Sequence, residues 1–164
     1  MNPPNDTGPG VRRLLIPIDL SRCSLDTFSV ANGLVASCGG AATLLYVLPA
    51  RAARPIGLER TLAGHHLSSL GRRYLRAGVS SHPRVRVGPP HQEIIEEAAA
   101  SASELILLPV PARAAWGRLF RRPYGRTALG VIASAPCRVF VVEVHRFFNC
   151  LRDSLLWGPA CAST

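Results

Sequence analysis

Short apolar runs alternate along this chain with segments of helical periodicity, and this alternation restricts the fold more than any other feature of the sequence. Most of the runs are continuously apolar at their centres, which is typical of strands buried on both faces. The exception, "RVRV", alternates like a half-exposed strand. The predicted strands cover residues 14–18, 42–48, 84–87, 104–110 and 137–144.

Between these runs, apolar residues recur at the spacing of a helix with one buried face. The predicted helices cover residues 24–38, 58–78, 91–103 and 127–135. On the third helix we expect the small and apolar residues to face inward and the acidic residues to face solvent. The expected inward residues are Ile94, Ile95, Ala98 and Ala99, and the expected solvent-facing residues are Glu93, Glu96 and Glu97.

Strands that alternate with helices predict a parallel sheet, because each crossover between parallel strands lays a helix on one face of the sheet. The expected fold class is therefore α/β, an open five-stranded parallel sheet with helices on both faces. A length of 164 residues fits one domain. Ligands bind such sheets outside the carboxyl ends of the strands. The candidate positions are Asp19, residues 47–49, Gly88 and residues 109–127.

Neither a membrane helix nor a signal peptide is predicted. No apolar stretch approaches the roughly 20 residues that a membrane helix needs, and the start "MNPPNDTGPG" has no basic or apolar region. We therefore expect a cytoplasmic protein. The five cysteines have no CxxC pair and no zinc-site spacing, so we expect them to be reduced and mostly buried. A redox role for one of them, such as Cys161, is the alternative.

The net charge of +9 comes from 19 basic residues, all of them arginine. A basic chain suits nucleic acid, a membrane surface or an acidic ligand. However, the absence of lysine beside abundant alanine, glycine and proline indicates a bias in composition. The positions of the arginines therefore carry more information than their number.

Four stretches of the chain resemble the universal stress protein family. "LLIPIDLS" is similar to the family's first strand and VPxDxS turn, and "ATLLYVL" is similar to its second strand. "VGPPHQEIIEEAAASASELILL" is similar to its glycine, helix and fourth strand, and "GRTALGVIASAPCRVFVV" to its last helix and strand. Together these stretches span residues 12–144 in the family's order.

The resemblance implies a Rossmann-like fold of the adenine nucleotide alpha hydrolase type. It implies a domain over residues 11–144, between a flexible N-terminus at 1–10 and an extension at 145–164 whose apolar residues recur at helical spacing. It also implies a non-enzymatic stress-response regulator. Such a protein acts as a homodimer, paired through its last strand, and binds a protein partner whose identity the sequence leaves open.

In the ATP-binding branch of the family, an aspartate after the first strand contacts the nucleoside, and the end of the second strand lies beside the base. A GxxGxxxxxxxxxG loop followed by Ser or Thr holds the phosphates through backbone N–H groups. The residues that the resemblance implies for a nucleotide site are Pro17, Asp19, Val47, Ala112, Arg113, Gly125, Arg126 and Thr127.

The phosphate loop of this chain departs from the family pattern. Counted forward from the strand "LILL", the first two glycine positions of the family motif are occupied by Pro109 and Ala112. Counted back from Gly125, they are occupied by Ala112 and Ala115. Arg126, not Ser or Thr, follows Gly125 directly. We therefore expect the backbone site for phosphate to be degraded, with no certain cofactor and ATP or another adenine nucleotide as a candidate.

Arginines and aromatic residues occupy the loop instead. The basic residues are Arg113, Arg118, Arg121, Arg122 and Arg126, interleaved with Trp116, Phe120 and Tyr124. Three interpretations remain open: a solvated basic loop, a nucleotide or small-anion site built from arginine forks, and a nucleic-acid site. Nucleic acid is the least favoured of the three.

The sequence contains no catalytic constellation and no metal-ligand motif. It has no GxSxG turn and no HExxH pair, and the acidic residues near the expected site are sparse. The sequence therefore leaves two functions open. The first is the non-enzymatic regulator with a degraded nucleotide site. The alternative is an ATP-binding protein, with or without slow hydrolysis, that uses loop arginines for the phosphates.

Overall fold

The structure, a computed structural model, describes residues 10–20, 23–35, 40–50, 56–112 and 125–145. Strands and helices alternate along the chain, as predicted. In chain order they are β1 (Arg13–Pro17), α1 (Leu25–Val35), β2 (Ala41–Leu48), α2 (Ile56–Tyr74), β3 (Ser80–Val87), α3 (Pro90–Ala100), β4 (Leu105–Pro111), α4 (Arg126–Ser134) and β5 (Arg138–Val144).

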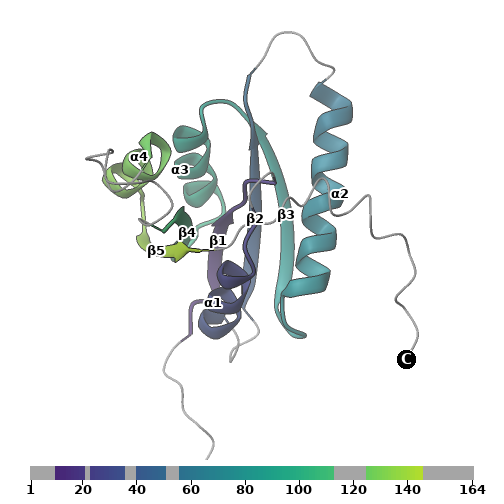
Figure 1. Ribbon diagram of the computed structural model, residues 1–164, viewed down its shortest axis with the longest axis vertical. Coiled ribbons are helices and arrows are strands. Elements are labelled where there is room, and N and C mark those ends of the chain that lie inside the picture. The colour runs from purple at the N-terminus through teal and green to yellow at the C-terminus, as the bar shows by residue number, and fades with distance from the viewer. Residues whose placement is uncertain (1–9, 21–22, 36–39, 51–55, 113–124, 146–164) are drawn as a thin grey trace, which may run out of the picture.

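The five strands form one sheet in the order β3-β2-β1-β4-β5, and every neighbouring pair is parallel (Figure 1). The predicted α/β class is therefore confirmed. The strand order reverses between β1 and β4, because the chain winds from β1 outward to β3 and then returns to β4 and β5. In an open sheet this reversal is the position where ligands bind.

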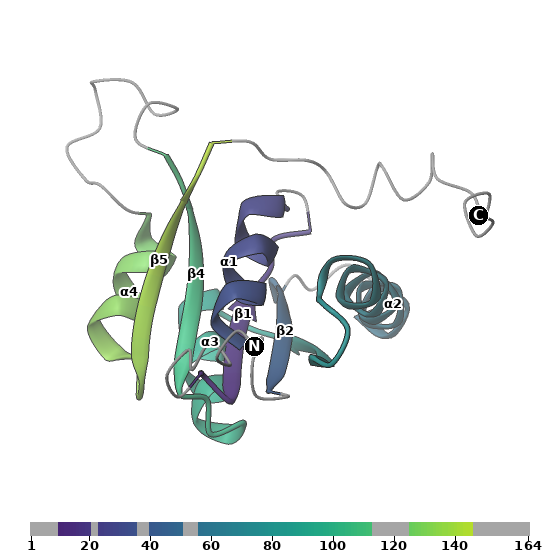
Figure 2. The same ribbon diagram turned by 90° about the horizontal axis from the view of Figure 1, so that it is seen from below.

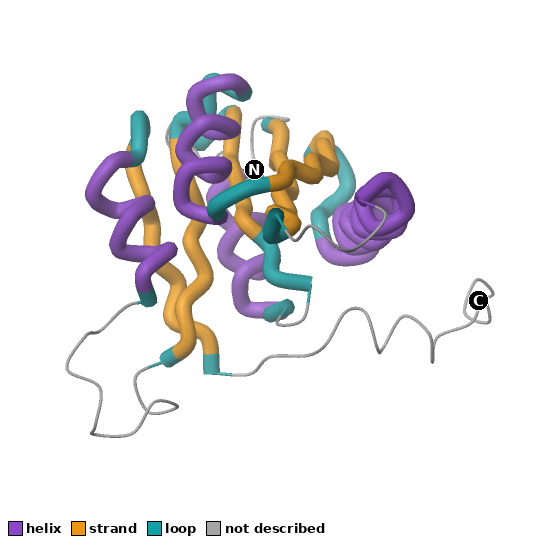
Figure 3. Tube along the Cα trace, turned by 90° about the horizontal axis from the view of Figure 1, so that it is seen from above, coloured by secondary structure: helices purple, strands orange, loops and turns teal. Residues whose placement is uncertain are grey.

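Each face of the sheet carries two helices. Leu14 and Ile16 of β1 pack in a cluster with α1 and α2, whereas Leu15 packs in a second cluster with α3 and α4. This division follows from the strand geometry, in which successive side chains point to opposite faces. Figures 2 and 3 show the strands between the two pairs of helices. A central strand with both faces buried requires the continuous apolar sequence seen in β1.

The edge strand β3 is longer than predicted. It begins at Ser80 rather than at 84, and it includes Pro83. Apolar periodicity missed its first half because an edge strand is largely exposed and therefore tolerates polar residues and proline.

The glutamates of α3 correct the expectation of a solvent-facing row. Arg86 of β3 donates hydrogen bonds to Glu93 (2.5 Å), Glu96 (2.6 Å) and Glu97 (3.1 Å). Glu96 is exposed, but Glu97 is buried, with 7 % of its surface accessible. The hydrogen bond to Glu93 contributes most to raising the pKa of Arg86. This ion cluster fixes α3 to the edge strand.

Two further expectations are corrected among the described residues. Ala99 is exposed rather than inward-facing, although Ile94 and Ala98 are buried. Cys23 is disulfide-bonded, so the expectation of reduced cysteines is wrong for this residue, while Cys137 is free. The other cysteines, most of the expected N-terminus and the expected C-terminal extension lie outside the described residues. In the part of the chain that the structure covers, no helix is long and apolar enough to cross a membrane.

The packing of α2 on β3 predicts opposite effects for one substitution at two positions of the same helix. At Gly71, a methyl group would collide with the Ser81 side chain, whereas at Gly64 it would meet no atom within 4 Å. Gly71→Ala is expected to destabilise the protein by about 1–3 kcal/mol through overpacking. Gly64→Ala is expected to stabilise it by about 0.5–1 kcal/mol, because alanine favours the helix.

Urea unfolding of the two variants measures both effects. Equal changes in the free energy of unfolding would contradict the close approach of α2 to β3 at Gly71. Adding Ser81→Ala to Gly71→Ala is expected to recover part of the loss, because it removes the nearest colliding atom.

Candidate functional site

The two central strands separate toward their carboxyl ends. Pairing between β1 and β4 covers only Leu14–Leu105 and Leu15–Ile106. On their other sides, β1 pairs with β2 as far as Pro17–Leu45, and β4 pairs with β5 as far as Pro111–Val144. The separation coincides with the reversal of strand order, so it marks the candidate site.

Prolines explain why the pairing stops there. The Ile18 N–H donates to the Leu45 carbonyl of β2 (2.7 Å), so the backbone of its neighbour Pro17 faces β4. The Ala112 N–H donates to the Val144 carbonyl of β5 (2.9 Å), so Pro109 and Pro111 face β1. None of the three prolines has an N–H group. Backbone donors are therefore missing from both sides of the separation.

Asp19 is the first exposed side chain after β1. The N-terminus of α1 is capped by Ser24, which accepts a hydrogen bond from the Asp26 N–H (3.1 Å). Sγ of Cys23 lies 3.6 Å from the Asp19 carbonyl oxygen.

Tyr46 of β2 is a neighbour of Asp19 that sequence reasoning missed. The side chain is half-buried against the cluster under α1 and α2. Burial raises the pKa of the Tyr46 phenol, and the negative charges of Asp19 and Glu59 raise it further. A polar residue inside an apolar run, beside the end of a neighbouring strand, was the available signal.

Val47 lies on the opposite face of β2 from Tyr46. It is half-buried and packs against the cluster under α3 and α4. The next carbonyl, that of Leu48, accepts a hydrogen bond from the Gly88 N–H (3.0 Å). Two of the expected positions, the end of β2 and Gly88, are therefore joined by a hydrogen bond.

Ala112 is committed to the sheet. Its side chain is 3 % exposed, and its N–H is the donor to Val144 described above. A phosphate group bound by a backbone nest needs N–H groups that are not already paired. Ala112 in this position has none to offer.

The N-terminus of α4 lies on the other side of the candidate site. Gly125 precedes the helix without any side-chain cap, and its carbonyl accepts the first helical hydrogen bond, from the Leu129 N–H (3.0 Å). The φ of Gly125 is −68°, and a methyl group there would meet no atom within 4 Å. The fold would therefore accept a side chain at this position. A ligand that approaches the backbone closely would need glycine there, because glycine has no side chain.

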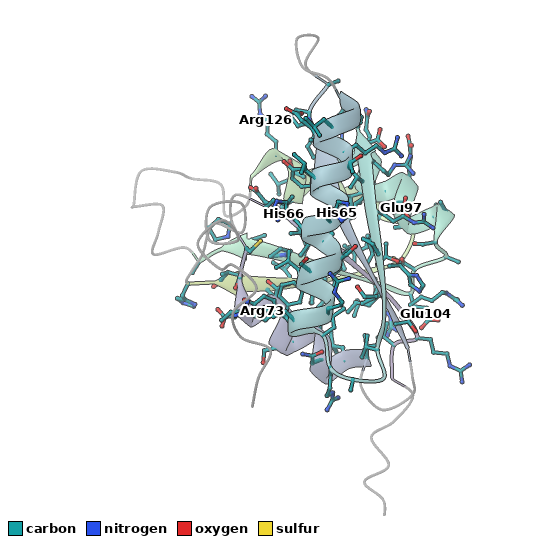
Figure 4. All side chains as sticks on the ribbon, turned by 90° about the vertical axis from the view of Figure 1, so that its right-hand side faces the viewer. His65, His66, Arg73, Glu97, Glu104 and Arg126 are labelled. Atoms are coloured by element: carbon teal, nitrogen blue, oxygen red, sulfur yellow. The ribbon has the colours of Figure 1, made fainter. Side chains whose placement is uncertain are left out.

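Arg126 and Thr127 form the first turn of α4. Arg126 is exposed and Thr127 is half-buried. Figure 4 places Arg126 at the end of the molecule toward which β3 runs, the carboxyl edge of the sheet. Arg113 and the rest of the arginine-rich loop up to Tyr124 lie outside the described residues.

Metal and catalytic groups are not assembled in the described part of the chain. No group of three or more His, Cys, Asp or Glu residues there is arranged to hold a metal ion. His65 and His66 both lie on α2 (Figure 4). What the described site offers is one carboxylate, one phenol and a helix N-terminus with an exposed arginine.

Comparison with protein families gives one match. The model of the Universal stress protein family matches residues 10–143. The matched segment takes in every helix and strand of the described fold, with β5 complete except for its last residue.

Several solved structures share the fold at low sequence identity. The hypothetical protein MJ0577 superposes with a TM-score of 0.67 at 19 % identity, over 83 % of this chain and 98 % of that one. UspA from Lactobacillus plantarum gives a TM-score of 0.60 at 22 % identity, over 83 % and 100 %. A universal stress protein in complex with cAMP gives 0.58 at 17 % identity, over 83 % and 99 %. Among curated proteins, none matches the sequence.

The electrostatic effect of Asp19 on Tyr46 predicts the result of a titration. Asp19→Asn removes a negative charge that disfavours the ionised phenol, so the pKa of Tyr46 is expected to fall, while burial keeps it above its ordinary value. NMR titration of the Tyr46 ring carbons measures the change. Glu143→Gln, an exposed carboxylate on β5, is the matched control and should leave the pKa unchanged.

The same shift predicts how stability depends on pH. Because folding raises the pKa of Tyr46, the unfolded chain loses this proton first, and stability is lost as the pH rises through the folded-state pKa. The loss is expected to be smaller in Asp19→Asn. An unchanged pKa in that variant would show that Asp19 lies too far from Tyr46 to act on it.

Proposed function

Because this chain belongs to the universal stress protein family, we propose that it is a non-enzymatic stress-response regulator that acts through dimerisation and partner binding and whose nucleotide site is degraded. In this proposal, residues 11–144 carry the function and the protein works in the cytoplasm.

One observation carries the proposal that the nucleotide site is degraded. The backbone at the end of β4 has no donor for a phosphate, since Ala112 is paired with Val144 and since Pro109 and Pro111 lack N–H groups. Each hydrogen bond to a charged group contributes about 1.5–3 kcal/mol. The loss of two or three of them would weaken binding by several orders of magnitude.

A second candidate, ATP binding through arginines, has separate support. A solved structure with this fold is a complex with cAMP. In this chain, the uncapped N-terminus of α4 and the exposed Arg126 suit an anionic group, and Asp19 suits a nucleoside hydroxyl. Pro17, Val47, Gly125 and Thr127 would complete that site, with Arg113 from the loop. Side-chain forks would then replace the backbone nest.

We base the proposal that the protein is not an enzyme on the side chains of the described residues. Among the described residues, the hydroxyl groups of Thr61, Ser68 and Ser101 donate to backbone carbonyls rather than to a base. The pairing of a nucleophile with a base is the usual requirement for covalent catalysis.

Dimerisation is proposed through β5, the edge strand beside β4. An uncovered strand edge invites pairing with another chain. Phe140 of β5 is 48 % exposed, and an aromatic side chain of this size is a frequent anchor of an interface. The partner in this proposal is a second copy of the chain.

Titration calorimetry with ATP tests the nucleotide site. We expect weak binding that falls steeply with salt, because exposed arginine side chains would supply most of the affinity. Arg122→Ala combined with Arg126→Ala is expected to abolish it. Arg138→Ala, an exposed arginine at the amino end of β5, is the matched control and should bind as the wild type does.

Two outcomes separate the candidate functions. Tight binding that is insensitive to salt would require a preformed backbone nest and would overturn the degraded site. Weak binding that Asp19→Ala also removes would support the second candidate, with the nucleoside beside β1.

Light scattering at micromolar concentration tests the dimer. The wild type is expected to show twice the mass of the chain, and Phe140→Glu is expected to give a monomer, because it buries a charge in the interface. Ile132→Glu on α4 makes the same change at a side chain of similar exposure, 42 %, and should remain dimeric. A monomeric wild type would rule out the β5 interface.

A further inference from the structure

Cys23 is disulfide-bonded, and neither the candidate site nor the proposed function accounts for this bond. The structure contains a single chain, so the second sulfur belongs to the same molecule. The other cysteines of the sequence are Cys38, Cys137, Cys150 and Cys161. Because Cys137 is free, the partner of Cys23 is one of the remaining three.

Cys23 lies at the carboxyl edge of the sheet. Its Sγ atom is 3.6 Å from the carbonyl oxygen of Asp19, the second residue after β1. Cys23 is buried, with 2 % of its surface accessible, and it directly precedes Ser24, the cap of α1. The disulfide therefore lies beside the candidate site, and the partner cysteine must reach this edge of the sheet.

The position of Gly40 excludes Cys38 as the partner. The Ala41 N–H donates to the Arg12 carbonyl (2.7 Å), so Gly40 lies beside the amino end of β1. About 20 Å of extended chain separates this end of β1 from the end beside Cys23. The chain between Gly40 and Cys38 spans at most about 7 Å, and a disulfide requires Cα atoms within about 7 Å of each other. Cys38 therefore cannot reach Cys23.

The chain that follows β5 starts at the same edge as Cys23. β5 ends at Val144, which pairs with Pro111 at the carboxyl end of β4. Val144 is buried in the same core cluster as Cys23. α1, which begins just after Cys23, packs against β4 and β5, and Figure 2 shows it beside β4. Only β4 separates β5 from β1, so the two strands lie about 10 Å apart.

Cys150 can reach Cys23 with the shorter connection of the two remaining cysteines. It is six residues beyond Val144, and six residues of extended chain span up to about 20 Å. Cys161 is 17 residues beyond Val144. Because closing a loop costs more entropy as the loop lengthens, Cys150 is favoured over Cys161 about fivefold.

We propose that Cys23 and Cys150 form a reversible disulfide, which oxidation closes and reduction opens, and which tethers the chain after β5 to the carboxyl edge of the sheet beside Asp19. The reactant is a low-molecular-weight disulfide, and the corresponding thiol reverses the reaction. In a cytoplasmic protein, disulfides are usually transient and redox-sensing. The inference rests in this respect on the proposed location, but its test involves neither ATP nor the dimer.

The exchange proceeds in two steps. Because Cys23 is buried, the Cys150 thiolate attacks the small disulfide first, forms a mixed disulfide and releases one small thiolate. The Cys23 thiolate then attacks the sulfur of Cys150 and releases the second. Two protein thiols are oxidised to one disulfide, and the small disulfide is reduced to two thiols, which take up the two protons.

The surroundings of Cys23 also suit the reduced state. A thiol is a weak hydrogen-bond donor, and the Asp19 carbonyl oxygen, 3.6 Å from Sγ, is within its reach. A disulfide sulfur has no hydrogen to donate. Opening the bond therefore gives the Asp19 peptide group a hydrogen bond, which links the redox state of Cys23 to the candidate site.

Peptide mapping tests which cysteine is bonded to Cys23. The free thiols of the full chain are blocked, and the chain is cut with trypsin without reduction. We expect peptide 23–51 to be joined to peptide 147–152, which contains Cys150. A bond to peptide 153–164, which contains Cys161, would overturn the assignment. Peptide 23–51 also contains Cys38, so Cys38→Ser is mapped as well, and loss of the bond in that variant would exclude Cys23.

Equilibration with glutathione tests whether the bond is reversible. The native chain is held in mixtures of oxidised and reduced glutathione, its thiols are alkylated, and the closed fraction is measured by mass. We expect nearly all molecules to be closed in excess oxidised glutathione and nearly all to be open in excess reduced glutathione. A bond that opens only after denaturation would be purely structural and would overturn the proposal.

Cys150→Ser and Cys137→Ser form a matched pair for the effect of the bond. In the wild type, reduction is expected to shift the amide signal of Leu20, whose peptide group carries the Asp19 carbonyl. Reduction is also expected to lower the melting temperature by about 5–15 °C, because the unfolded chain regains its freedom. Cys137→Ser should respond as the wild type does, and Cys150→Ser should show neither change. Equal responses of the two variants would contradict the tether.

Discussion

Three prolines in the middle of the sheet set the form of this molecule. Pro17 on β1 and Pro109 and Pro111 on β4 face one another across the centre of the sheet, where each lacks the N–H group that would continue the ladder. Pairing between the two strands therefore ends at Leu15–Ile106, although both strands continue along their other neighbours. The sheet opens where the winding reverses, and the residues around that opening form the candidate site.

The same prolines limit what the opening can bind. In a parallel sheet, a backbone donor is either used by a neighbouring strand or left for a ligand. Here Ala112 is used by β5, and the prolines have no donor to leave. In the function proposed above, positive charge for a phosphate would come from side chains and from the first turn of α4. The described backbone at the end of β4 therefore leaves few unpaired N–H groups at the opening.

The side chains on β3 and β5 also explain why the two edges of the sheet differ. At β3, Pro83 lies on the outward side and Arg86 is held by three glutamates, which leaves only a short stretch of open backbone. At β5, the exposed Phe140 offers an apolar contact instead. An edge strand that presents an aromatic ring suits a self-complementary contact.

The sequence by itself determined the order of elements and the class of fold, because buried strands need continuous apolar runs such as "LLIPI" and covering helices need one apolar stripe. It also placed Asp19 and Gly125 after a strand and before a helix. Only the tertiary structure decided which polar groups meet. Glu97 was expected in solvent but is buried against Arg86, and Tyr46 lies near Asp19 through the register of β1 and β2. The periodicity of apolar residues indicates which positions of a helix or strand face the core. Contacts between residues far apart in the chain depend on strand order and register, which local patterns do not encode.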